Sequence, residues 1–381
     1  MKIYYISTAE IPSDKANSIQ VVKMCAAMTQ SGHAVCLLLP DYAAQRGYSS
    51  EDVKAHYGLN SEFDIKRVKL SKFLGKPRFL WQSVNTACRD QVDLIFTRSL
   101  EAAVFGLIKN MPVILECHNL PSGKLGPLWF RLFLKLPGQK RLVIITRALQ
   151  SKLGEKYPLT LKNEQMLIAP SGVDVDRYAH LPMPSSAREY LKLPQKYTVV
   201  CTGHLYEGRG MDLFLNLAEA FHGLQFVWVG GAQVDVAYWR SKADQKALSN
   251  VLFTGFVAPA LIPTYQAAAD LLLMPYEQTF SGSAGTEISD VSSPMKLFEY
   301  MAAGKPIICS DLPIFREVID ETTAVLVPPM DIQAWMTAVR LVSNSPGEYQ
   351  ALGQRAREQA AKFSWIERSQ RILAGFPKPE N

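Results

Sequence analysis

Short apolar runs alternate with segments of helical periodicity along almost the whole chain, and this alternation limits the fold more than any other feature. The runs that read as strands fall into one block in each half of the chain: 3–6, 35–39, 65–68, 94–96, 113–116 and 143–145, then 198–201, 226–229, 251–254, 271–274, 306–309 and 324–327. Helical patterns lie between them, for example over 19–29 and 102–109. The alternation predicts an α/β fold with two Rossmann-like domains, each built on a parallel sheet covered on both faces.

A stretch without periodicity separates the two blocks. Residues 169–186, APSGVDVDRYAHLPMPSS, are rich in Pro, Gly, Ser and Asp. We expect an N-terminal domain over 1–175, a C-terminal domain over 176–362, and a last helix within 363–381 that packs back toward the N-terminal domain. Ligands of open α/β sheets bind beyond the carboxyl ends of the strands, so we expect the site in a cleft where the two sheets face each other.

The composition and the charge distribution indicate which class of protein this is and which kind of partner it binds. Apolar residues make up 48% of the 381 residues, the six cysteines are scattered, and no run is long enough for a transmembrane helix. We expect a cytoplasmic protein without a structural metal. Residues 1–180 carry 24 Lys and Arg against 15 Asp and Glu, whereas the rest carry 17 against 20. The basic half predicts an anionic partner, and the lack of a nucleic-acid-binding motif argues against nucleic acid.

The segment SSPMKLFE, residues 292–299, reads as the start of a helix that binds phosphate. Ser293 suits the cap and Pro294 suits the first helical position. The free amides of such a first turn bind phosphate oxygens, and Glu299 lies roughly 7–8 Å further along the axis, about the distance from a diphosphate to the ribose hydroxyls. The alternative is an ordinary capped helix with a solvated glutamate.

Three loops that follow strands carry further candidates. The segment GHLYEGRG, residues 203–210, offers glycines for close backbone approach and Arg209 as a forked phosphate donor. His118 follows the strand over 113–116, where a structural histidine is the alternative. Asn17 or Ser18 is expected to cap the helix after the first strand.

Taken together, SSPMKLFEYMAAGKPII with SDLP after it, GHLYEGRG, APSGVD and DKANSIQVVKM resemble family 4 glycosyltransferases of the GT-B fold, over residues 1 to about 370. The resemblance implies transfer of a sugar from a UDP- or GDP-linked donor, with retention of configuration and without a metal. The acceptor is a hydroxyl of a saccharide or lipid-linked saccharide, bound by the N-terminal domain, in the synthesis of envelope polysaccharide or glycolipid. The C-terminal domain holds the nucleotide.

The resemblance also assigns roles to single residues. It assigns catalytic roles to His118, near the donor sugar, to Arg209, on the diphosphate, and to Glu299, on the ribose hydroxyls. Contacts with the donor are expected from a larger set: Asn17, Ser18, Gly203, His204, Arg209, Thr254, Gly255, Phe256, Ser292, Ser293, Pro294, Met295, Lys296 and Glu299. For Lys296, an ordinary surface lysine is the alternative interpretation.

One position departs from the family pattern. Many members carry a second glutamate eight residues before the ribose-binding one, and here that position is Val291. Asp290, Glu287 or backbone amides are the candidates to replace it. No acidic partner is identifiable beside Glu299, so we expect a front-face substitution in which the leaving diphosphate helps to deprotonate the acceptor, rather than a covalent intermediate.

The segment LGPLWFRLFLKL, residues 125–136, combines an apolar face with basic residues. With the neighbouring basic residues it forms a candidate contact, 124–141, for an anionic membrane surface, which would make the protein peripheral on the inner face of the cytoplasmic membrane. The alternative is a helix that faces the core.

Two other functions stay open: a nucleotide-sugar 2-epimerase of the same fold, and a non-catalytic partner protein related to glycosyltransferases.

Overall fold

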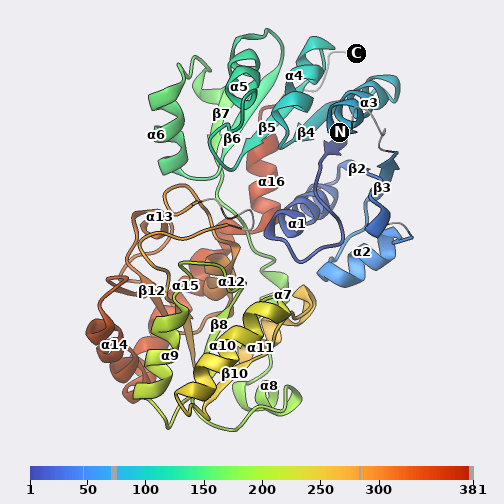
Figure 1. Ribbon diagram of the computed structural model, residues 1–381. Coiled ribbons are helices and arrows are strands. Elements are labelled where there is room, and N and C mark those ends of the chain that lie inside the picture. The colour runs from blue at the N-terminus through green and yellow to red at the C-terminus, as the bar shows by residue number, and fades with distance from the viewer. Residues whose placement is uncertain (46, 70–74, 283–284, 286, 377–381) are drawn as a thin grey trace. The chain divides into compact units, whose positions relative to one another are not determined.

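A computed structural model describes residues 1–45, 47–69, 75–282, 285 and 287–376 (Figure 1). The chain forms two compact units. The first comprises Met1–Ser171 together with the C-terminal segment from Trp365, and the second comprises Gly172–Ser364. The boundaries predicted from the sequence, after residues 175 and 362, lie within four residues of the observed ones, after 171 and 364.

In the described part of the first unit, seven parallel strands form one sheet in the order β3-β2-β1-β4-β5-β6-β7. The strands are β1 (Lys2–Ile6), β2 (Ala34–Pro40), β3 (Asp64–Val68), β4 (Leu94–Thr97), β5 (Val113–Cys117), β6 (Lys140–Ile144) and β7 (Met166–Ile168). The helices are α1 (Ala16–Gln30), α2 (Ser50–Tyr57), α3 (Gly75–Arg89), α4 (Leu100–Ile108), α5 (Gly126–Lys135), α6 (Arg147–Lys156) and α16 (Trp365–Leu373).

Helices cover both faces of this sheet. Crossovers between parallel strands are right-handed, and the strand order reverses after β3, so α1 and α3 lie on opposite faces. Helices α3, α4 and α5 pack side by side, and α16 packs beside α1, as the red and dark-blue ribbons of Figure 1 show. The C-terminal helix is therefore part of the first unit.

In the described part of the second unit, six parallel strands form a sheet in the order β10-β9-β8-β11-β12-β13. The strands are β8 (Thr198–Thr202), β9 (Gln225–Val229), β10 (Val251–Phe253), β11 (Leu271–Met274), β12 (Ile307–Ser310) and β13 (Val325–Val327). The helices are α7 (Asp176–Ala179), α8 (Pro184–Tyr190), α9 (Met211–Ala220), α10 (Gln233–Gln245), α11 (Ile262–Ala268), α12 (Met295–Ala303), α13 (Pro313–Arg316), α14 (Ile332–Asn344) and α15 (Pro346–Ala360).

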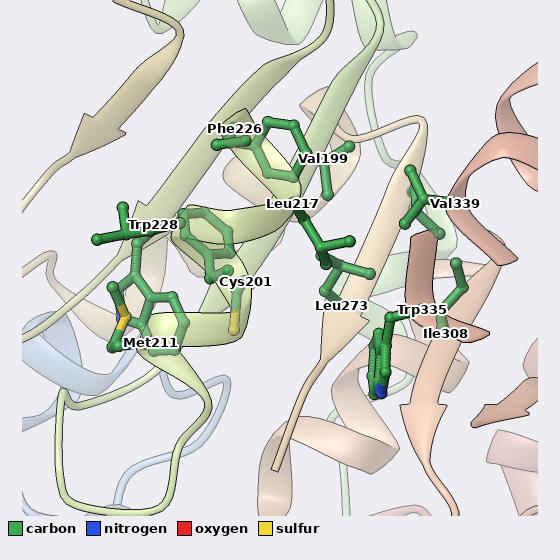
Figure 2. Packing of buried hydrophobic residues seen from close by; sticks show 14 of the residues in the cluster. Val199, Cys201, Met211, Leu217, Phe226, Trp228, Leu273, Ile308, Trp335 and Val339 are labelled. Carbon is green, nitrogen blue, oxygen red and sulfur yellow. The ribbon is translucent and has the colours of Figure 1, made fainter. Parts of the chain in front are cut away.

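The core of the second unit anchors one of the candidate loops. Figure 2 shows residues of β8 and β9 packed with residues of α9, and residues of β11 and β12 near those of α14: Val199, Cys201, Met211, Leu217, Phe226, Trp228, Leu273, Ile308, Trp335 and Val339. The fully buried Trp228 donates its indole N–H to the carbonyl oxygen of Gly203 at 2.9 Å. The core therefore fixes the point at which the loop over 203–210 leaves the sheet.

The expected α/β class, with two Rossmann-like parallel sheets, is confirmed. All twelve runs expected as strands are strands, within three residues at each end. The sequence missed β7, whose residues MLI are all half-buried at the edge of the first sheet. A half-buried edge strand of three residues leaves too short an apolar run to be recognised.

Three residues of the segment 124–141 do not fit a contact with a membrane surface. Phe130 of α5 is fully buried, so this side chain belongs to the core. Lys140 is also buried, and its Nζ donates to the carbonyl oxygens of Phe133 and Leu134, both at 2.8 Å. Arg141 is buried too and donates to the carbonyl oxygen of Ala374 at 2.9 Å. These two basic residues satisfy the carbonyls at the ends of α5 and α16, so neither can contact a membrane.

Candidate functional site

The candidate residues of the second unit follow the carboxyl ends of its strands. The strand order reverses between β8 and β11, and the loop over 203–210 follows β8 while Tyr276 follows β11. Such a reversal is the usual ligand site of an open α/β sheet, because the two loops diverge there. The two loops are joined by hydrogen bonds, from the amide of Glu277 to the carbonyl of Gly208 and from the amide of Ser281 to the carbonyl of Glu207, at 3.0 and 3.1 Å.

Arg209 lies across aromatic rings at this point. Its guanidinium carbon is 4.4 Å from the ring centroid of Tyr276 and 5.0 Å from that of Phe280. One nitrogen of the guanidinium donates to the carbonyl oxygen of Ser281 at 2.8 Å. A guanidinium has five N–H donors in a fixed fork, so this single bond orients the group and leaves donor capacity for an anion.

Lys296, on α12, places a second cation on the same ring. Its Nζ lies 4.8 Å from the ring centroid of Tyr276 and is buried, without a hydrogen-bond partner among the described residues. Gly203 makes room for it, because a Cβ at this position would lie 3.1 Å from the Nζ. The interpretation of Lys296 as a surface lysine is therefore wrong.

The start of α12 differs by one residue from the expectation. The helix begins at Met295, and Pro294 is its N-cap, with extended dihedrals and no side-chain cap hydrogen bond. Ser293 is therefore not the cap, and Pro294 is not the first helical residue. Ser292 is buried, and its Oγ has no hydrogen-bond partner among the described residues. A buried hydroxyl and a buried ammonium without internal partners thus lie within four residues of each other at a helix N-terminus.

Glu299 is half-buried on α12, three residues after Lys296, so the two side chains emerge on one face of the helix. Its charge reaches Tyr178 of α7: burial raises the pKa of Tyr178 well above its usual value, and the Glu299 carboxylate adds to that rise. Val291 is buried, so no polar side chain stands at the position of the missing glutamate. Glu287 is exposed and accepts a hydrogen bond from Ser289 Oγ at 2.8 Å.

The remaining candidates of this unit also lie in loops at the carboxyl edge. Thr254 follows β10, and its hydroxyl donates to the carbonyl of Gly255 and accepts from the amide of Gly230, at 2.8 and 3.3 Å. The Phe256 side chain is 52% exposed. The ring of His204 stacks on that of Tyr206, with centroids 4.8 Å apart.

In the first unit, the expected cap of α1 is wrong. The N-cap is Lys15, without a side-chain cap hydrogen bond. Ser18 is buried, and its hydroxyl bonds the hydroxyl of Ser13 at 2.9 Å and the carbonyl of Lys15 at 2.7 Å. Asn17 is exposed and accepts a hydrogen bond at 2.5 Å from Arg98, which follows β4 at the reversal of this sheet. Arg98 was not among the residues predicted from the sequence, although it directly follows β4, a strand that the sequence predicted.

His118 follows β5 and bonds Glu116 of that strand. The Nε2 atom of His118 lies 2.5 Å from Oε1 of Glu116, and Arg368 of α16 donates to Oε2 at 2.9 Å. Burial alone would raise the pKa of Glu116, but Arg368 and the hydrogen bond from His118 hold it well below its usual range. Burial lowers the pKa of His118 to about 4, the charge of Arg98 acts in the same direction, and Glu116 opposes both. The histidine is thus neutral at pH 7.

The structure therefore brings together Gly203, Arg209 and Lys296, with Tyr276 as the ring that joins the two cations. The residues Asn17, Ser18 and His118 belong to the other unit. Among the described residues, no group of three or more His, Cys, Asp and Glu side chains is arranged to hold a metal ion. No helix in the described ranges has the length and hydropathy needed to span a bilayer.

Comparisons with known proteins bear on the family and on the fold. Residues 196–344 match the family described as "Glycosyl transferases group 1". The chain is 24% identical over 225 residues to an alpha-galactosylglucosyldiacylglycerol synthase of Streptococcus pneumoniae, covering 53% of this chain and 55% of that protein. It is 26% identical over 203 residues to a GDP-mannose-dependent alpha-(1-6)-phosphatidylinositol monomannoside mannosyltransferase of Mycobacterium tuberculosis, covering 51% of each. The chain thus spans about half the length of these curated relatives.

Among solved structures, the chain is similar to Anabaena HepE in complex with UDP, with a TM-score of 0.73, 18% identity and 98% of each chain covered. It is also similar to WaaG, a glycosyltransferase involved in lipopolysaccharide biosynthesis, with a TM-score of 0.67, 15% identity and 98% of this chain and 100% of that chain covered. Likenesses at such low identity bear on the fold alone, and they confirm the GT-B fold expected from the sequence.

Proposed function

Because residues 196–344 match the family described as "Glycosyl transferases group 1", we propose that the protein is a glycosyltransferase that uses a nucleotide diphosphate sugar. The second unit binds the donor and the first unit binds the acceptor. The donor carries UDP or GDP: the structural relative HepE is known in complex with UDP, and the mannosyltransferase relative is named as GDP-mannose-dependent. The acceptor is a hydroxyl of a glycolipid or of a lipid-linked saccharide, because one relative is named as a synthase of a glycosyldiacylglycerol and another as a phosphatidylinositol monomannoside mannosyltransferase.

The observation that carries this proposal is the pair of cations on Tyr276. The ammonium of Lys296 is buried without a hydrogen-bond partner among the described residues, and so is the hydroxyl of Ser292, four residues earlier in the sequence. Burial of a charge without a partner is costly, so such a site favours an anion that supplies the missing hydrogen bonds. With Arg209 and the N-terminus of α12, these groups suit a diphosphate rather than a single carboxylate.

In the proposed reaction the bond between the anomeric carbon and the diphosphate breaks, and the charge of the leaving group grows on its oxygens. Arg209, Lys296 and the first amides of α12 stabilise that charge, so the reaction requires no metal. The leaving phosphate oxygen takes the proton of the acceptor hydroxyl, which attacks from the same face, and configuration is retained. Glu299 accepts hydrogen bonds from the ribose hydroxyls, and His118 bonds the donor sugar.

Assays of donor turnover test the proposal. The protein is incubated with a panel of UDP-, GDP- and ADP-sugars and glycolipid acceptors, and release of nucleoside diphosphate is measured. We expect release with one donor class, and a fall in kcat of about 10²–10³-fold for Arg209→Ala, as for the loss of one transition-state donor. Binding of nucleotide without turnover of any donor would favour the non-catalytic partner protein.

The relatives reported above are named as a synthase and transferases, which gives the epimerase alternative no support.

A membrane surface is a proposed partner of the first unit. Helices α3, α4 and α5 carry an edge-to-face series of Trp81, Phe105 and Trp129, with centroids 5.2 and 5.5 Å apart. On α4, on α5 and directly beside their ends, large apolar side chains and basic side chains are exposed: Ile108, Leu125 and Leu128, with Lys109, Lys124, Arg131 and Lys135. We call this set the aromatic surface. Exposed apolar groups among lysines and arginines suit the interface of an anionic bilayer, where a lipid-linked acceptor lies.

A further inference from the structure

We infer that Arg368 and Glu116 are positioning residues that hold His118 in its Nε2–H tautomer, so that Nδ1 is an acceptor for a hydroxyl of the donor sugar. The inference rests on the proposed function for the sugar, but the tautomer itself is a property of the first unit alone. It gives the C-terminal helix, far from His118 in the sequence, a role in the site.

The carboxylate of Glu116 is shared between three donors. Its Oε2 accepts from Arg368 at 2.9 Å, and its Oε1 lies 2.5 Å from His118 Nε2 and 3.3 Å from the Nε2 of Gln20. Glu116 is 1% exposed, and Arg368, with His118 and Arg98, lowers its pKa far enough to hold it ionised. An ionised carboxylate is an acceptor only, so the proton between it and His118 belongs to the histidine.

The charge state of His118 then fixes its other nitrogen. The charged groups that act on it are Glu116 on its own strand, Arg98 after β4 and Arg368 on α16, and burial with the two arginines outweighs the carboxylate. A neutral imidazole has one N–H, and here Glu116 takes it at Nε2. Nδ1 therefore carries a lone pair, which accepts from a hydroxyl but repels a phosphate oxygen.

Arg368 is itself fixed by the fold. It is 3% exposed and donates to the carbonyl oxygens of Pro170 and Ala169 at 2.6 and 3.0 Å, in addition to Glu116. Pro170 and Ala169 follow β7 at the end of the first unit's sheet. Arg368 therefore links α16 to the end of the sheet and to the carboxylate of Glu116. Because a lysine lacks the planar fork of donors, it would replace the arginine only in part.

The wild-type protein allows a first test that needs no substitution at the cluster. Full-length protein with ¹⁵N-labelled histidine is studied by long-range ¹H–¹⁵N NMR, and His118→Gln identifies the resonances of His118 among the six histidines. We expect a protonated Nε2 and an unprotonated Nδ1 at pH 7. A protonated Nδ1, or a doubly protonated ring at that pH, would overturn the inference.

Glu116→Gln tests the link to activity. The amide oxygen stays on Arg368, so the amide NH₂ faces His118 Nε2 and forces the Nδ1–H tautomer. We expect the tautomer to change and kcat to fall by about 10²–10⁴-fold, as a wrong histidine tautomer does elsewhere, with the affinity for UDP or GDP unchanged. An unchanged tautomer with kcat within threefold of wild type contradicts the inference. If wild type binds neither nucleotide, the proposed function fails, and the NMR result still decides on the tautomer.

Variants of α16 separate positioning from folding. Arg368→Met removes the donor, Arg368→Lys restores it in part, and Glu116→Gln with Arg368→Met removes both buried charges in case the single variants do not fold. Ser369→Ala is the matched control, because Ser369 is buried on the same helix and bonds Ser31 Oγ at 3.1 Å rather than Glu116. We expect kcat to rank Ser369→Ala, then Arg368→Lys, then Arg368→Met. Equal kcat for Arg368→Met and Ser369→Ala would contradict the role of Arg368.

Discussion

The Nζ atom of Lys296 lies 4.8 Å from the centroid of the Tyr276 ring, so a buried cation from a helix start rests on an aromatic ring that follows β11. Arg209 approaches the same ring at 4.4 Å from the loop after β8. Cation–π contacts of this kind are worth up to about 2 kcal/mol when the groups are desolvated. The ring therefore holds two positive charges close together, and an anion bound there gains from both.

Gly203→Ala is expected to weaken donor binding. The residue has a φ of +127°, and the new Cβ would lie 3.1 Å from Lys296 Nζ and displace it. We expect about tenfold weaker binding of UDP or GDP by isothermal titration calorimetry, a ratio that corresponds to about 1.4 kcal/mol. Gly32→Ala is the control, since Gly32 also has a positive φ, of +84°, but has open space around it. Equal affinities for the two variants would contradict the role of Gly203.

Acid should destabilise the first unit through His118. The folded pKa is about 4, below the usual 6.5, so the unfolded chain binds more protons between these values. The contribution of the neutral histidine to the free energy of unfolding is therefore fully present above pH 6.5. It is lost as the pH falls toward 4, and the loss reaches up to about 3 kcal/mol. Thermal unfolding at pH 7 and pH 5 measures it. His118→Gln should lose less Tm than wild type over this interval, and an equal or larger loss would refute the prediction.

Gln266→Met is expected to stabilise the second unit. Gln266, on α11, is fully buried, and neither its Nε2 nor its Oε1 has a hydrogen-bond partner among the described residues. Methionine has a similar shape without the buried polar atoms, so the free energy of unfolding should rise by about 1–2 kcal/mol. Urea unfolding followed by tryptophan fluorescence measures the change. A decrease would mean that the amide has partners in solution.

Leucines of the aromatic surface should decide membrane binding. Leu125 and Leu128 are 58% and 50% exposed, whereas Phe130 is buried. In sedimentation with anionic vesicles at low salt, Leu125→Glu with Leu128→Glu should abolish binding, because it removes apolar area and adds repelling charge. Leu252→Glu, at an exposed leucine of the second unit, is the control. No binding by wild type, or equal binding by the double variant, removes the proposal.

The sequence was most informative where a physical pattern is local. The strand and helix periodicities predicted both sheets, and the glycine-rich loop with Arg209 was identified from residue types alone. The start of α12 was misplaced by one residue, because Pro294 suits both the cap and the first helical position, and only the dihedrals distinguish them.

Contacts between residues far apart in the chain could not be predicted from the sequence. The contact between Arg368 and Glu116 joins residues 252 positions apart, and no periodicity connects α16 with β5. The burial of Lys140 and Arg141 was missed for the same reason, because a basic residue next to an amphipathic helix resembles a surface charge until the carbonyls that it binds are known.

The most direct test of the account is calorimetric titration of wild type and Lys296→Met with UDP or GDP and with the corresponding nucleoside. Loss of a charge-assisted hydrogen bond, worth about 1.5–3 kcal/mol, should weaken diphosphate binding about 10–100-fold and leave nucleoside binding unchanged. Lys246→Met, at a surface lysine paired with Glu219 in the same unit, should bind like wild type. Diphosphate binding by Lys296→Met that equals wild type, or no diphosphate binding by wild type, would contradict the central claim.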